Sequence, residues 1–221
     1  MNLRNLYRIG LVALLVQAGV AAWAFSQTGL LATVPTHWGP DGEVDGYGPA
    51  WLSFGLVPVI SVAVVAMFGL IPRIEPRRQN LQLSASAYRQ MGVSVVGLMT
   101  LVEVGVCLAG TGHDVPMALL IGLGIGVMFM VLGNVMGTVR SNYMFGVRTP
   151  WTLASDLSWD KTHRLAGRLF FVAGAALVVV SLLGNPFLVF GLMLGFIVLV
   201  LPVTFIYSYR VWKADPDRRP S

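Results

Sequence analysis

Six long apolar segments constrain the fold of this chain more than any other feature of its sequence. They lie at about residues 9–30, 51–72, 90–111, 116–138, 166–184 and 187–208. Each is close to the roughly 20 residues that a helix needs to cross the hydrocarbon core of a bilayer. Only 11% of the 221 residues are charged, against roughly 25% in a typical soluble domain. The sequence therefore predicts an all-α, polytopic membrane bundle of six transmembrane helices.

The basic residues predict the orientation of this bundle. All 15 Lys and Arg residues lie at the chain ends or around the connections between segments two and three and between segments four and five. The alternate loops hold no Lys or Arg and instead carry acidic residues, namely Asp41, Glu43, Asp45 and Asp114. Because cytoplasmic loops retain positive charge, both termini are predicted to be cytoplasmic.

The first apolar segment also has features of a cleavable signal peptide. Arg4 and Arg8 precede it, and Ala22-Trp23-Ala24 has the small-x-small pattern of a cleavage site. The apolar run continues through Leu31, which is longer than a signal core needs, so we expect a retained span. Cleavage is the alternative, and it would leave five spans and an external N-terminus.

Small and polar residues inside the spans point to helix packing. Gly122, Gly126, Gly133 and Gly137 fall on one face of the fourth segment, and Gly191 and Gly195 repeat the small-xxx-small spacing in the sixth. Such patterns allow close approach of helices in lipid. We expect packing within the monomer, with a homodimer seam as the alternative.

Glu103 is the only acidic residue within a predicted span. A charge there is costly, so the carboxyl should face the bundle or be protonated. One interpretation is an ion or proton relay. The other is a structural carboxyl that hydrogen-bonds Thr100 or Asn134, and both interpretations stay open.

The first external loop, residues 34–49, is rich in Pro and Gly and predicts successive turns, with positive φ at Gly42 and Gly46. Its candidate functional residues are His37, Trp38, Asp41 and Asp45. A calcium-loop pattern begins here but fails, because Leu52 stands where a bidentate Glu is required. A looser site that adds His113 and Asp114 is the alternative. We favour solvated acidic turns, and no metal or cofactor is predicted.

The connection at residues 139–165 is unusually rich in polar and aromatic side chains. Ser155 can cap a helix that leads into the fifth span. Trp151 and Trp159 suit the lipid headgroup zone, so an interfacial anchor and a docking site for a partner or ligand are both open. The candidate binding residues are Asn142, Arg148, Thr149, Pro150, Trp151, Trp159, His163 and Arg164.

These segments resemble the signatures of the SdpI family of bacterial membrane proteins. The likeness rests on the stretch 142–164, with Gly146-Val147-Arg148-Thr149-Pro150-Trp151-Thr152 and Trp159-Asp160-Lys161-Thr162-His163-Arg164. The earlier loop, with Pro35, His37, Trp38, Gly42 and Asp45, is similar to a domain of unknown function often joined to that family, although Trp38-Gly39 replaces its frequent Phe-Asn. The resemblance divides the chain into a two-span half at 1–89 and a four-span region at 90–221.

The resemblance implies a multi-pass protein of the bacterial inner membrane that gives immunity to a secreted peptide toxin and signals to a cytoplasmic regulator. Sharing a family does not fix the activity of one member. We therefore weigh two further hypotheses. One is a transporter or channel that uses Glu103, and the other is a membrane-surface enzyme that uses His163 and Asp160. The enzyme hypothesis ranks last, because the sequence shows no paired nucleophile and base. No direct contact with nucleic acid is expected.

Overall fold

The computed structural model describes residues 3–218 and consists mainly of six long helices. They are α1 (Arg4–Thr28), α2 (Ala50–Ile74), α4 (Ala85–Gly110), α5 (Met117–Met136), α7 (Asp156–Leu182) and α8 (Pro186–Ala214). All six are long and apolar enough to cross a membrane. The shorter elements are β1 (Thr33–Trp38), β2 (Val44–Pro49), α3 (Arg78–Leu83) and α6 (Pro150–Ala154). The predicted six-helix membrane fold is confirmed.

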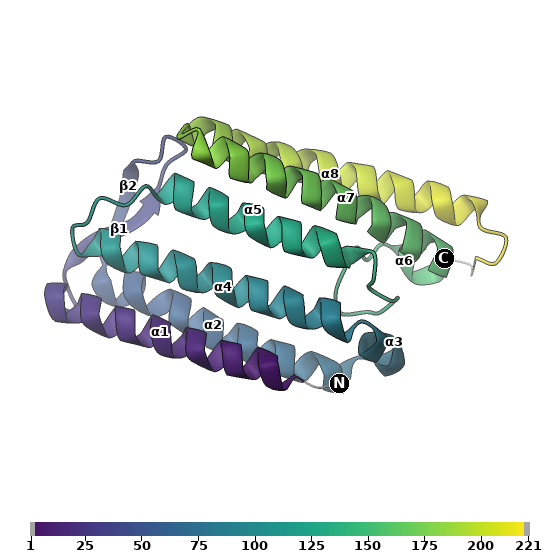
Figure 1. The fold of residues 1–221 in the computed structure, drawn as a ribbon, viewed down its shortest axis with the longest axis horizontal. Coiled ribbons are helices and arrows are strands. Elements are labelled where there is room, and N and C mark those ends of the chain that lie inside the picture. The colour runs from purple at the N-terminus through teal and green to yellow at the C-terminus, as the bar shows by residue number, and fades with distance from the viewer. Residues whose placement is uncertain (1–2, 219–221) are drawn as a thin grey trace.

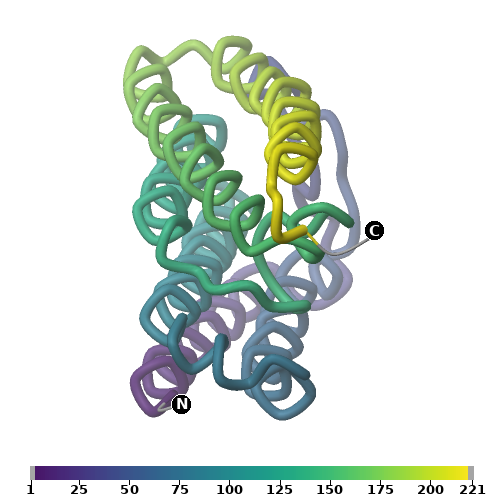
Figure 2. Tube along the Cα trace, turned by 90° about the vertical axis from the view of Figure 1, so that its right-hand side faces the viewer, coloured from purple at the N-terminus to yellow at the C-terminus, as the bar shows by residue number. Residues whose placement is uncertain are grey.

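The long helices run side by side, and the two chain ends lie at the same end of the bundle (Figure 1). We call this end the terminal end and the opposite one the hairpin end, because β1 and β2 lie there. Viewed along the bundle, α4 and α5 separate the pair α1 and α2 from the pair α7 and α8 (Figure 2). Every Lys and Arg among residues 3–218 lies in the terminal half, and Arg219 falls outside the described residues. A cytoplasmic location of the terminal end stays a prediction.

Two local signals set the boundaries of the last two spans. The Ser155 hydroxyl accepts the Ser158 N–H at 2.9 Å, so α7 begins at Asp156, ten residues before the predicted start of the fifth span. Gly184 adopts a φ of 71°, and the Asn185 side chain accepts the Leu188 N–H at 3.2 Å to start α8. The predicted cap at Ser155 and the break before the sixth span are both confirmed.

Glycine packing joins α5 to α7. A Cβ added at Gly133 would lie 2.5 Å from the Phe171 nitrogen and 2.6 Å from the Gly167 oxygen, so the two backbones are in direct contact. The predicted close approach on the fourth span is confirmed within the monomer. In contrast, a Cβ added at Gly191 or Gly195 would meet nothing within 4 Å. Packing of these two glycines inside the monomer was therefore a wrong expectation.

The loop at residues 34–49 forms an antiparallel hairpin rather than the predicted series of turns. Val34 is buried against Phe54 and other apolar residues at the hairpin end of the bundle, and this burial holds β1 in place. Gly42 has the predicted positive φ, 85°, but Gly46 does not. Gly46 lies in β2 opposite His37, where an added Cβ would come within 2.8 Å of the His37 Cβ. Gly46 thus provides space rather than an unusual backbone angle.

The predicted division of the chain at residue 89 falls inside α4. This helix packs against α1 and α2 on one side and against α5 on the other. No linker separates the two-span half from the four-span region, so the central helix is shared between them.

Candidate functional site

The tip of the hairpin is fixed by its own hydrogen bonds. The Gly39 N–H donates to the Glu43 carbonyl at 2.8 Å, and the Gly42 N–H donates to the Gly39 carbonyl at 3.0 Å. The Asp41 carboxylate accepts the Glu43 N–H at 3.0 Å, an Asx arrangement that suits a tight turn. An added Cβ at Gly42 would lie 3.2 Å from the Pro186 ring, so the tip rests on the turn between α7 and α8.

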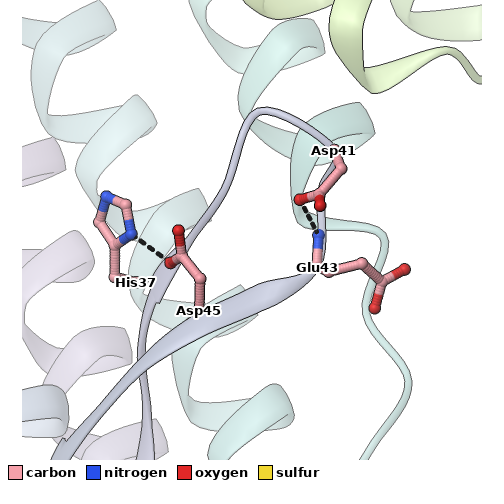
Figure 3. Close-up of polar contacts among 4 residues, drawn as sticks. All are labelled: His37, Asp41, Glu43 and Asp45. Carbon is pink, nitrogen blue, oxygen red and sulfur yellow. Dashed lines mark hydrogen bonds and ion pairs between the residues drawn. The ribbon is translucent and has the colours of Figure 1, made fainter.

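His37 and Asp45 form a pair of their own across the two strands. Their side chains are 72% and 51% exposed, and the His37 ring nitrogen contacts an Asp45 carboxylate oxygen. Figure 3 shows this pair apart from Asp41 and Glu43 along the hairpin. Two of the predicted external residues thus contact each other on the surface, apart from the carboxylates at the tip.

A cavity of about 390 Å³ lies beneath the hairpin, between the α4–α5 connection and the α7–α8 turn. Asp41, Glu43 and Asp114 contribute carboxylates to its lining, and Trp38 and His113 add aromatic rings. Within the described part of the chain, no Lys or Arg lines this acidic cavity. Three carboxylates in one concavity create a negative potential that attracts cationic groups.

The structure does not assemble the alternative metal site. Among residues 3–218, no group of three or more His, Cys, Asp or Glu residues could hold a metal ion. The two external histidines have different neighbours. His113 contacts the Thr111 hydroxyl at 3.1 Å and its ring lies beside Trp23, whereas His37 pairs with Asp45.

At the terminal end, Asn142 organises the connection between α5 and α7. Its side-chain oxygen accepts the N–H groups of Met144 and Phe145 at 2.9 and 2.8 Å, and its amide donates to the Arg140 carbonyl at 2.9 Å. The side chain is fully buried. All its bonds are made within the connection, so Asn142 shapes the loop from inside.

His163 is the second organising residue of this connection. Its Nδ1 donates to the Trp159 carbonyl at 2.9 Å, because a carbonyl can only accept, and its Nε2 accepts the Val147 N–H at 3.0 Å. The two rings stack at 4.0 Å, and the Trp159 indole donates to the Val139 carbonyl at 2.7 Å. Both ring nitrogens of His163 are therefore bonded to backbone groups of the connection and of α7.

Trp159 corrects one expectation. It was expected in the headgroup zone but is only 1% exposed, because its indole N–H finds a backbone carbonyl inside the bundle. Trp151 is half-buried and packs on Phe205 and Tyr209 of α8. Asp160 and Arg164 are spaced one turn apart on α7 but form no ion pair among the described residues.

The short helix α6 ties the connection to α8. The Thr149 and Thr152 side chains form a capping box, and the Thr149 hydroxyl donates to the Ser208 hydroxyl at 3.0 Å. The Ser155 hydroxyl donates to the Asp215 carboxylate, which is buried. Of the eight candidate binding residues, only Arg148, Pro150 and Arg164 are exposed. A partner would meet these three first.

Two residues that the sequence analysis missed hold this region to α2 and α3. The Glu75 carboxylate is fully buried and accepts the N–H groups of Arg77 and Tyr143 at 2.8 and 3.1 Å. The Arg77 guanidinium lies 4.6 Å from the Tyr143 ring centroid and donates to the Ser141 hydroxyl and the Leu153 carbonyl. The sequence did offer a signal for Glu75, because it is the one acidic residue in the connection between α2 and α4, whose other charged residues are arginines.

The intramembrane candidates have other neighbours than expected. Glu103 is fully buried, and its carboxyl accepts a hydrogen bond from the Cys107 thiol at 3.3 Å. Thr100 accepts instead from the Gln17 amide at 2.9 Å. Asn134 is exposed on α5. Neither Thr100 nor Asn134 is therefore the partner of Glu103, and its role in transport stays a prediction.

Comparisons with known proteins identify sequences similar to this chain. Residues 138–208 match the model of the SdpI/YfhL protein family, and residues 12–62 match a domain of unknown function, DUF1648. The chain is also 26% identical over 162 residues to the immunity protein SdpI of Bacillus subtilis (strain 168), covering 73% of this chain and 75% of that relative. The chain is therefore similar to the SdpI family within its second half and to SdpI itself over most of its length. It is a multi-pass cell membrane protein. No solved structure matches it.

The SdpI family match spans the parts of the terminal end that the hydrogen bonds connect. It begins just after α5 and covers the connection, α6, α7 and most of α8. The DUF1648 match covers most of α1, the hairpin and the first half of α2. The acidic cavity is therefore lined by both matched regions, through the hairpin and the α7–α8 turn, and also by the α4–α5 connection, which lies in neither match.

Proposed function

We propose that this membrane protein is an SdpI-family immunity protein whose acidic cavity binds a positively charged part of a secreted peptide toxin. The similarity to a protein named for immunity supports the general role. The observation that carries the proposal is the cavity itself, with carboxylates from Asp41, Glu43 and Asp114 and no Lys or Arg among its described lining residues. Complementary charge raises the rate of encounter and selects partners of the opposite sign.

The hairpin connects the acidic cavity to α8, so binding of a peptide in the cavity can change the position of that helix. Its tip contacts the Pro186 ring at the start of α8. The other ends of α7 and α8 hold α6 through the Ser155–Asp215 and Thr149–Ser208 hydrogen bonds. We propose that a bound peptide favours a second arrangement of these helices, which a cytoplasmic regulator recognises at Arg148 and Pro150. A ligand shifts such an equilibrium only as far as its affinities for the two arrangements differ.

Survival of a sensitive bacterium tests the toxin-binding role. Cells that express the protein are challenged with a panel of secreted cationic peptides. The triple substitution Asp41→Asn, Glu43→Gln and Asp114→Asn removes the negative charge with little change in shape. The matched control is Asp45→Asn, which alters a carboxylate of the same hairpin outside the cavity.

We expect wild-type and Asp45→Asn cells to survive at peptide concentrations that kill cells carrying the triple variant. Membrane abundance of each variant is measured by immunoblot. Equal protection by the triple variant at equal abundance would remove the cavity from the mechanism. The regulator is tested separately, since Arg148→Gln should keep survival and lose co-purification of the cytoplasmic partner. Unchanged co-purification would refute that docking role.

A further inference from the structure

A groove between α5 and α7 lies in the terminal half of the bundle, away from the acidic cavity. It has a volume of about 460 Å³. Both views show the two helices side by side (Figures 1 and 2). Its lining consists of Gly133, Asn134, Gly137, Arg164, Gly167, Arg168, Phe171 and Val172.

The groove exists because glycines on both helices have no side chains to fill it. Gly133 and Gly167 bring the helix backbones into contact and leave no side chain to fill the surface beside the seam. At Gly137 an added Cβ would lie 3.5 Å from the Arg164 side chain, so the stem of that arginine runs over the glycine. The hollow is therefore a direct result of the glycine packing that joins α5 to α7.

The polar residues of the groove have no partner of their own. Arg164 and Arg168 stand one turn apart on α7, and both are exposed. Asn134 is exposed on the neighbouring helix. Within residues 3–218, none of the three makes a hydrogen bond or an ion pair. An unpaired amide on the outside of a membrane helix is costly, and two cations beside it attract an anion.

The deeper part of the groove is apolar. Phe171 and Val172 are 43% and 67% exposed. They follow Arg164 by seven and eight residues, which places them about 10 Å further along the helix at the standard rise. From the terminal end inward, the groove thus offers two cations, an amide and then exposed hydrocarbon. This order matches an amphiphile with an anionic head and an acyl chain.

We propose that this groove binds an anionic phospholipid of the adjacent leaflet. Arg164 and Arg168 hold the phosphate, the Asn134 amide donates to an oxygen of the glycerol region, and one acyl chain lies over Phe171 and Val172. Basic pockets between transmembrane helices are suited to such headgroups. Charge argues against a second copy of this chain, because a two-fold contact through the groove would gather four arginines. The proposal does not depend on the immunity role.

Native mass spectrometry of the full-length protein in a non-ionic detergent tests this site. The protein is titrated with phosphatidylglycerol or with phosphatidylethanolamine of the same acyl chains. We expect the wild type to prefer phosphatidylglycerol. Loss of both arginines in Arg164→Gln/Arg168→Gln should weaken that binding about thirtyfold. The variant Asn134→Leu should weaken it several-fold.

The control variant Arg8→Gln/Arg210→Gln removes two exposed charges from the terminal half outside the groove. We expect its affinity to stay within about twofold of the wild type, because the lipid contacts are local. Size-exclusion chromatography checks that each variant is monodisperse, and Asn134→Leu tests the site alone if the arginine variant does not fold. Equal affinity for the two lipids, equal loss in the control variant, or an oligomer that the groove variants dissociate would each overturn the proposal.

Discussion

At Gly146 the backbone adopts a φ of 105°, and the glycine lies against the imidazole of His163. A left-handed conformation suits glycine because it has no Cβ to clash with its own carbonyl. The same contact lets the Val147 N–H reach the His163 Nε2 at 3.0 Å. One glycine thus satisfies both a backbone angle and a packing requirement in the connection between α5 and α7.

Replacing this glycine should unfold the connection before the helices. Gly146→Ala adds backbone strain and a clash with the His163 ring, for a cost of about 2–5 kcal/mol. Gly184→Ala is the matched control, because Gly184 has a φ of 71° but nothing within 4 Å of an added Cβ. Thermal unfolding of the detergent-solubilised protein gives the Tm of each of the two variants. A loss of Tm no larger than that of the control would show that the imidazole contact adds nothing.

The sequence indicated that residues 139–165 have a specific role, but it could not distinguish a role in binding from a role in the fold. Asn142, Trp159 and His163 have polar groups that suit either a partner or the fold. Their actual partners are mostly backbone groups, such as the Val139 carbonyl and the Val147 N–H. The positions of these groups depend on how α5 and α7 pack, which no short sequence window contains.

At the scale of elements, the helices were predictable and the hairpin was not. Hydropathy is a local property, so all six spans appear in the sequence, although α7 begins ten residues before the predicted start of the fifth span. The strand pair depends instead on the burial of Val34 against α2 and on the fit of Gly46 opposite His37. Pro35 in β1 and the Gly and Pro residues of β2 favour turns locally. The tertiary contacts override that preference.

The α5–α7 seam should be the most sensitive helix contact to added volume. In Gly133→Ala the new methyl group meets the backbone of α7, so we expect a destabilisation of about 1–3 kcal/mol. The matched substitutions are Gly191→Ala and Gly195→Ala, which point into open space and should be neutral within about 0.5 kcal/mol. The fraction that stays monodisperse after heating gives the comparison. A loss of oligomers in the two α8 variants would instead support the homodimer seam.

For the whole molecule, both the chain ends and the described basic residues lie at one end of the bundle. This charge asymmetry predicts that the terminal end is cytoplasmic. It also predicts that the acidic cavity opens to the outside, where a secreted peptide would arrive. The orientation of the bundle therefore decides which ligand can reach which site.

Cysteine labelling tests this orientation. The native Cys107 is buried and is replaced by Ala. A cysteine is then placed at Leu31, which is 84% exposed at the hairpin end, or at the exposed Pro150 at the terminal end. A membrane-impermeant maleimide should label Leu31→Cys in intact cells and Pro150→Cys only after permeabilisation. The reverse pattern would invert the bundle and with it the proposed direction of signalling.

Because the hairpin tip packs on Pro186, the cavity is formed by segments that are far apart in the sequence. The roof of the acidic cavity comes from the region before α2, whereas much of its wall comes from the beginning of α5 and the turn before α8. Neither piece encloses a binding volume without the other. The cavity is therefore complete only when the hairpin, the α4–α5 connection and the α7–α8 turn come together in one assembled molecule.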